Sequence, residues 1–154
     1  MIEIYTTGNA RQIGNKWIGA YAYSIYKDNK AITQYSCVIT PATQNLSELI
    51  AFANVLHTIH NKYPNEEIKS HTKSMYLIGG VEKCNKMNSN KDAWALISKL
   101  YDADNMTIRH ISDTSVTNNE KHKSRMKHID ALAKQKLKSG CSKHNEQAGE
   151  QNEK

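Results

Sequence analysis

The spacing of the apolar residues changes along the chain, and this change constrains the fold more than any other sequence feature. Residues 2–7 alternate in side-chain character, and residues 17–26 and 31–39 are rich in aromatic and β-branched residues, which is typical of strands. In residues 45–62 the apolar positions instead recur every three or four residues, which indicates an amphipathic helix. Three strands therefore precede the first helix.

The rest of the chain alternates between the two kinds of pattern. Further strands are expected at 66–72 and 106–111, and further helices at 74–83, 91–102 and 120–138. The resulting order is β-β-β-α-β-α-α-β-α. It predicts an α/β fold in which a mixed five-stranded sheet carries helices on both faces, with the first strand flanked by a meander and by parallel strands.

A length of 154 residues is enough for one domain, which we place at residues 1–138. Residues 139–154 lack apolar content and are expected to be a polar, disordered tail. Neither a membrane-spanning apolar run nor a signal-peptide pattern is present, and the three cysteines form no ligand or disulfide spacing. These features predict a cytoplasmic protein, or one of the host cytoplasm if it is viral.

Positive charge is concentrated near the C-terminal end. The chain has a formal net charge of +6, and residues 121–138 contain seven basic residues against the single acid Asp130. A helix of this density indicates a polyanionic partner, most simply nucleic acid, although a solvated helix face is the alternative. The candidate contacts at the start of the helix are Lys121, Lys123, Arg125 and Lys127.

Five short motifs occur in a fixed order along the chain. They are IEIYTTGNA (2–10), QNLSELIAF (44–52), HTKSMYLIGGV (71–81), NKDAW (90–94) and HIDALAKQ (128–135). In order and spacing, the set resembles the type 1 ribonuclease H family, whose corresponding motifs are T-D-G-S, N-N-x-x-E-L-x-A, T-D-S-x-Y, N-x-D-L-W and R-x-D-x-L-A. The resemblance covers about residues 2–138 and implies a ribonuclease H-like fold.

The family cleaves phosphodiesters with two divalent ions held by four carboxylates. By the resemblance, those positions fall on Thr7, Glu48, Lys73 and Asp130, so two carboxylates are kept and two are lost. Mg²⁺ requires oxygen ligands, and an ammonium group at position 73 repels a dication. The resemblance therefore implies a degenerate site with no metal and no cofactor, Mg²⁺ being relevant only if residual activity exists.

The two surviving carboxylates have alternative interpretations. Lys73 is able to reach both Glu48 and Asp130 and to replace the metals with an internal salt bridge. Alternatively, Glu48 is the N3 partner of an Asn45 helix cap, and Asp130 pairs with lysines on its own helix.

By the same resemblance, polar residues are expected to contact nucleic acid; each has an alternative role as a loop or cap residue. They are Asn9, Asn15, Gln44, Asn45 and Ser74. Trp17 and Trp94 are expected in the core, and His57, His60, His110 and His128 show no metal-ligand spacing.

Three functions follow from these observations. The first is a catalytically inactive protein that binds RNA/DNA hybrid or duplex through the basic helix and the former substrate face. The second is a protein-interaction module, for example an inhibitor or assembly factor of viral or mobile-element origin. The third is a residual hydrolase in which Glu48, Asp130 and Asp113 hold one metal ion.

Overall fold

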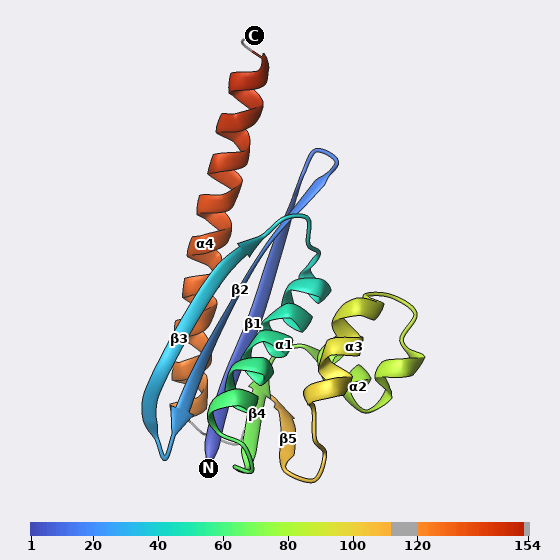
Figure 1. Ribbon diagram of the computed structural model, residues 1–154. Coiled ribbons are helices and arrows are strands. Elements are labelled where there is room, and N and C mark those ends of the chain that lie inside the picture. The colour runs from blue at the N-terminus through green and yellow to red at the C-terminus, as the bar shows by residue number, and fades with distance from the viewer. Residues whose placement is uncertain (112–119, 153–154) are drawn as a thin grey trace.

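The computed structural model describes residues 1–111 and 120–152 and confirms the predicted α/β class (Figure 1). A five-stranded sheet has the order β3-β2-β1-β4-β5, with β1 antiparallel to β2 and parallel to β4. The strands are β1 (Ile2–Ile13), β2 (Lys16–Lys27), β3 (Lys30–Ile39), β4 (Ile68–Thr72) and β5 (Met106–His110). The helices are α1 (Gln44–Lys62), α2 (Met75–Gly80), a 3₁₀ turn (Val81–Lys86), α3 (Lys91–Leu100) and α4 (Glu120–Asn152).

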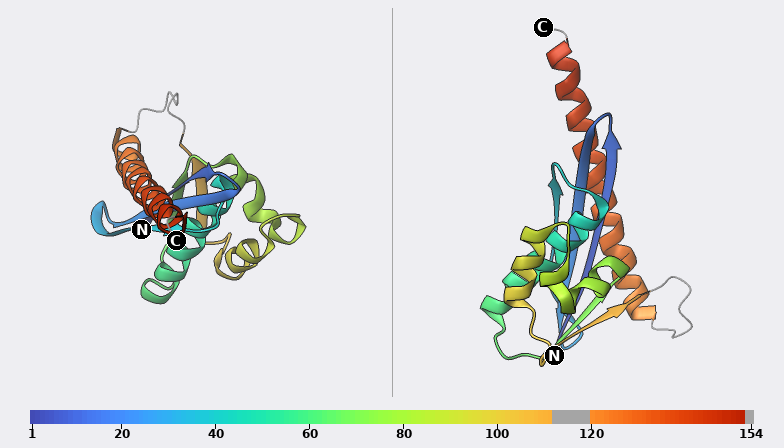
Figure 2. Two further views of the ribbon diagram at one scale, coloured as in Figure 1. Left: turned by 90° about the horizontal axis from the view of Figure 1, so that it is seen from above. Right: turned by 90° about the vertical axis from the view of Figure 1, so that its right-hand side faces the viewer.

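Helices cover both faces of the sheet, as predicted. Helices α1, α2 and α3 lie on one side and α4 lies on the other (Figure 2). Because side chains alternate along a strand, Ile2 and Ile4 of β1 join the core beneath α1, whereas Tyr5 packs with Met126 and Ile129 of α4. Polar residues of β1 that lie an even number of positions from Tyr5 therefore also face α4.

Strand β1 is longer than the sequence analysis predicts. Gly8 and Asn9 indicate a turn in the sequence, but the strand continues to Ile13 and the hairpin turns at Gly14, whose φ is +60°. Gly8 instead allows a close approach of α1, since a Cβ at this position would lie 2.5 Å from the backbone nitrogen of Glu48. Residues 8–13, which lie outside the strand predicted at 2–7, therefore belong to β1.

The cap of α1 also differs from the prediction. Thr43 is the N-cap residue, and its hydroxyl accepts a hydrogen bond from the Leu46 backbone N–H at 3.3 Å. Asn45 lies inside the helix, so Glu48 is not the N3 partner of a cap. The side chain of Glu48 is instead buried against β1.

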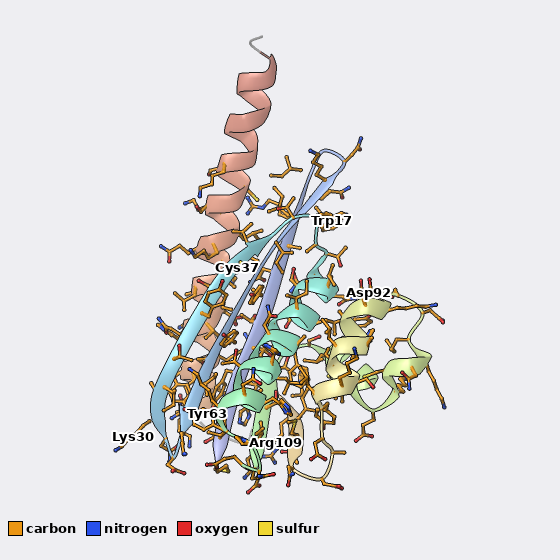
Figure 3. All side chains as sticks on the ribbon, in the orientation of Figure 1. Trp17, Lys30, Cys37, Tyr63, Asp92 and Arg109 are labelled. Carbon is orange, nitrogen blue, oxygen red and sulfur yellow. The ribbon has the colours of Figure 1, made fainter. Side chains whose placement is uncertain are left out.

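The two tryptophans have different surroundings. Trp94 of α3 is fully buried and lies against Gly80, whose missing Cβ leaves room for the indole. Trp17 is 38% exposed and lies at the start of β2, close to the β1–β2 hairpin (Figure 3). The prediction that both are core residues is correct only for Trp94.

Helix α4 does not end at residue 138. It continues to Asn152 and projects past the sheet, on the same side as the β1–β2 hairpin (Figures 1 and 2). Leu137 and Cys141 are four residues apart and bury their side chains against Ile18 and Ala20 of β2. The boundary after residue 138 and the expected disorder of 139–154 are thus corrected for residues 139–152, because the buried stripe of α4 extends to Cys141.

None of the described helices combines enough length with enough apolar character to cross a membrane. The three cysteines are free thiols, as their spacing suggested.

The extension of α4 predicts that a charge at Cys141 is costly. Cys141→Asp places an unpaired carboxylate in an apolar contact and should lower the free energy of unfolding by about 2 kcal/mol or more. The neighbouring Ser142 is exposed, so Ser142→Asp should change it by less than about 0.5 kcal/mol. Urea unfolding of both variants checks this; equal effects would contradict a docked helix beyond residue 138.

Candidate functional site

The four positions matched to the catalytic carboxylates converge on one cleft, although they come from four separate elements. Thr7 lies on β1, Glu48 on α1, Lys73 directly after β4 and Asp130 on α4. The cleft has a volume of about 340 Å³. Its lining includes all four residues together with Gly8, Asn9, Gln44, Asn45, Ser74, Met75, Tyr76 and Lys134.

Asp130 is held by two donors inside this cleft. The Thr7 hydroxyl donates to Oδ1 at 2.5 Å, and the Lys73 ammonium donates to Oδ2 at 2.8 Å. Both carboxylate oxygens are therefore engaged, one of them by a cation. Asp130 therefore pairs with Lys73, which directly follows β4. Among the described residues, no ion pair joins Asp130 to a lysine of its own helix.

Glu48 is in a different electrostatic state. Burial raises the pKa of its carboxyl to about 8, and the nearby Asp130 charge raises it further, whereas a hydrogen bond from the Gly8 backbone and the charge of Lys73 oppose the rise. Its Oε2 atom is buried without a hydrogen-bond partner among the described residues. Lys73 therefore acts on both carboxyl groups, through an ion pair with Asp130 at 2.8 Å and through its charge on Glu48.

The polar residues expected to contact nucleic acid divide into two groups. Asn9 and Asn45 line the cleft, and Asn9 Nδ2 is buried without a partner among the described residues. Gln44 also lines it, but its amide donates to the Gly8 carbonyl and accepts from the Ala10 N–H at 3.0 Å, so it fastens α1 to β1. Ser74 caps α2 by accepting from Leu77 N–H at 3.0 Å.

Asn15 does not belong to the cleft. It is exposed in the turn between β1 and β2 and is absent from the lining. Asp113, which the hydrolase hypothesis invokes, lies outside the described residues.

The four basic residues at the start of α4 also have different surroundings. Lys123 and Lys127 line a second hollow of about 750 Å³, which shares Lys73, Asp130 and Lys134 with the cleft. Arg125 instead covers the Tyr26 ring, with its guanidinium carbon 3.6 Å from the ring centroid, and Lys121 donates to Asn29 at 2.9 Å. Lys121 and Arg125 are thus engaged elsewhere in the chain.

Lys134 is a site residue that the sequence analysis did not select. It lines both hollows, and its spacing of four residues from Asp130 and seven from Lys127 is the signal that places the three on one side of the helix.

Comparison with known proteins agrees with this architecture. No family model matches the sequence, and no curated protein sequence is significantly similar to it. Among solved structures, LC11-RNase H1, isolated from compost and solved in complex with an RNA/DNA hybrid, matches at 21% identity and a TM-score of 0.71, with 92% of this chain and 99% of that chain covered. The RNase H domain of prototype foamy virus matches at 19% identity and a TM-score of 0.73, over 90% and 94% of the two chains. The chain has a ribonuclease H-like fold.

A longer protein also contains this unit. The foamy viral protease-reverse transcriptase, solved in complex with an RNA/DNA hybrid, matches at 19% identity and a TM-score of 0.72. The match covers 88% of the ribonuclease H-like chain described here and 20% of the viral protein.

The donor set of the ribonuclease H-like cleft does not fit a pair of magnesium ions. Mg²⁺ accepts oxygen ligands in near-octahedral geometry, but one position here holds an ammonium that occupies Asp130 Oδ2. Another position holds a hydroxyl that donates its proton to Oδ1 of the same carboxylate.

The Glu48 carboxyl predicts a pH dependence of stability. Its pKa is about 8 in the folded chain against an ordinary 4.5, so the unfolded chain loses the proton first and stability falls as pH rises from about 4.5 to 8. Glu48→Gln removes this fall. The variant should gain a few kcal/mol over the wild type at about pH 9 relative to about pH 4.

Thermal unfolding across this pH range measures the effect. Glu67→Gln, at an exposed position in the same chain, is the control and should follow the wild type. A Glu48→Gln curve parallel to the wild-type curve would show that the carboxyl is not protonated by burial.

Proposed function

We propose that this ribonuclease H-like domain binds RNA/DNA hybrid or duplex nucleic acid without hydrolysing it by the two-metal mechanism. The observation that carries the proposal is the hydrogen bond of the Lys73 ammonium to Asp130, in the centre of the cleft. The Lys73 ammonium supplies positive charge from the chain itself, whereas the metal-dependent mechanism needs bound dications.

The charge around the cleft supports a polyanionic ligand. Lys73, Lys123, Lys127 and Lys134 line the two adjoining hollows. The acids that line them are Glu120, the buried Glu48 and Asp130, which is paired with Lys73. A row of ammonium groups on a helix contacts phosphates irrespective of base sequence, so we expect binding that depends strongly on salt and weakly on sequence.

Neutral donors in the cleft add a means of distinguishing RNA from DNA. The Asn45 side chain is exposed in the lining of the cleft, and its amide is a donor as well as an acceptor. Groups of this kind recognise a ribose 2′-hydroxyl without adding charge. The solved structures of LC11-RNase H1 and the foamy viral protein with RNA/DNA hybrids support the hybrid as the first ligand to test.

The lysines of α4 predict a specific loss of binding. The double variant Lys123→Glu/Lys127→Glu should weaken hybrid binding at least tenfold at about 50 mM salt, because it reverses two charges beside the cleft. The matched control, Lys86→Glu/Lys99→Glu, changes the net charge equally at exposed positions that line neither hollow, and should weaken binding by less than about threefold.

Mobility shift over a salt series measures both pairs of variants with hybrid, duplex RNA and duplex DNA. Absence of binding by the wild type at about 50 mM salt would refute the proposal and leave a protein partner as the better hypothesis. Equal losses in the two double variants would indicate a general effect of charge instead of a site.

The lost carboxylates predict a gain of magnesium binding. Thr7→Asp/Lys73→Asp removes the ammonium and places four carboxylates around the cleft, so Mg²⁺ should raise the melting temperature of this variant and leave that of the wild type unchanged. Thr7→Asn/Lys73→Asn is the control without added charge. A wild type that binds Mg²⁺ and cleaves the hybrid would overturn the assignment of an inactive site.

A further inference from the structure

A second cluster of chemically active side chains lies on the α4 side of the sheet. It consists of Glu3 on β1, His71 on β4 and His122 on α4. One ligand atom from each residue lies within 4.8 Å of the other two. Glu3 and Thr7 are four residues apart on one strand, so the cluster is separate from the cleft.

The atoms of this cluster face one another at short range. Glu3 Oε2 lies 3.1 Å from His71 Nε2 and 3.7 Å from His122 Nδ1. The Tyr5 hydroxyl completes the group at 3.3 Å from Glu3 Oε2 and forms a hydrogen bond with His122 Nδ1. In a tetrahedral zinc site with bonds of about 2.0–2.1 Å, neighbouring ligand atoms lie roughly 3.3 Å apart. The two separations from Glu3 Oε2 are close to that value, and the ligand atoms of His71 and His122 lie within 4.8 Å of each other.

We propose that Glu3, His71 and His122 bind a divalent transition-metal ion such as Zn²⁺, with the fourth position beside the Tyr5 hydroxyl. Two imidazoles and one carboxylate from three elements are a donor set suited to zinc and unsuited to magnesium, which prefers oxygen. The inference does not rest on nucleic-acid binding.

Two cations beside the cluster orient the Glu3 carboxylate and limit the affinity for a metal ion. Lys121 Nζ and Arg125 Nη1 lie 3.8 and 3.9 Å from Glu3 Oε1, which leaves Oε2 directed at the two histidines. The same two cations repel a dication. We therefore expect weaker binding than at a structural zinc site with thiolate ligands, and we expect Lys121→Met to tighten binding severalfold.

The bound ion would join three elements that are distant in sequence. Glu3 and His71 come from neighbouring parallel strands, and His122 comes from the first turn of α4, close in sequence to Lys123 and Lys127 of the second hollow. Metal binding should therefore raise the melting temperature by fastening the start of α4 to the sheet.

Cobalt spectroscopy tests the site on the intact chain. Co²⁺ added to the wild-type protein should produce the strong visible bands of a four-coordinate nitrogen and oxygen site, and Zn²⁺ should displace it in equal amount. His122→Gln should reduce Zn²⁺ affinity at least tenfold, as measured by calorimetry. His128→Gln, at an exposed position on the same helix that contacts Gln34, is the matched control and should bind as the wild type does.

Two outcomes would overturn the proposal. One is a wild-type protein that gives only the weak spectrum of six-coordinate aqueous cobalt. The other is equal Zn²⁺ binding by the wild type and His122→Gln, which would locate the metal at other surface histidines. Because His122 is only part-buried, its variant should fold, and far-ultraviolet circular dichroism confirms that it does. Hybrid binding is measured separately, so loss of either property leaves the other interpretable.

Discussion

The structure depends on strand β1 being covered on both faces at once. Its backbone approaches α1 so closely at Gly8 that a methyl group has no space there, and its opposite face receives Tyr5 and Thr7 against α4. Helix α1 packs on β1 through apolar side chains, and α4 packs on it through polar and aromatic side chains. These contacts fix the position of each helix along the strand. This arrangement brings Glu48 and Asp130 into one cleft from opposite sides of the sheet.

Within that cleft, the two acids are accommodated in different ways. Asp130 is paired with the Lys73 ammonium, whereas Glu48 is buried and its pKa is raised. Burial of a charged carboxylate is costly, and protonation reduces that cost.

The sequence predicts most of the architecture because strand and helix periods are local signals. The order of elements, the placement of helices on both faces and the burial of Trp94 all follow from them. The resemblance of short motifs also identifies Thr7, Glu48, Lys73 and Asp130, which the structure brings to one cleft.

The errors arise where tertiary packing overrides local preference. Gly8 is typical of a turn, yet here it permits the close approach of a helix to a continuing strand. Residues after 138 are too polar to predict a helix, but Leu137 and Cys141 both bury against β2 and extend the docked part of α4 past residue 138. Glu3 and His71 are 68 residues apart, so no spacing rule brings them together, and only the parallel pairing of β1 with β4 does so.

Helix α4 carries His122, Asp130 and Cys141, each of which contacts a different part of the sheet. An α-helix rises about 1.5 Å per residue, so these three anchors lie about 12 and 17 Å apart along one rigid rod. Sliding the helix by a single turn would break all three contacts together. Detachment of α4 is therefore expected to be a cooperative, all-or-none opening, with amide hydrogens in these segments exchanging at a common rate.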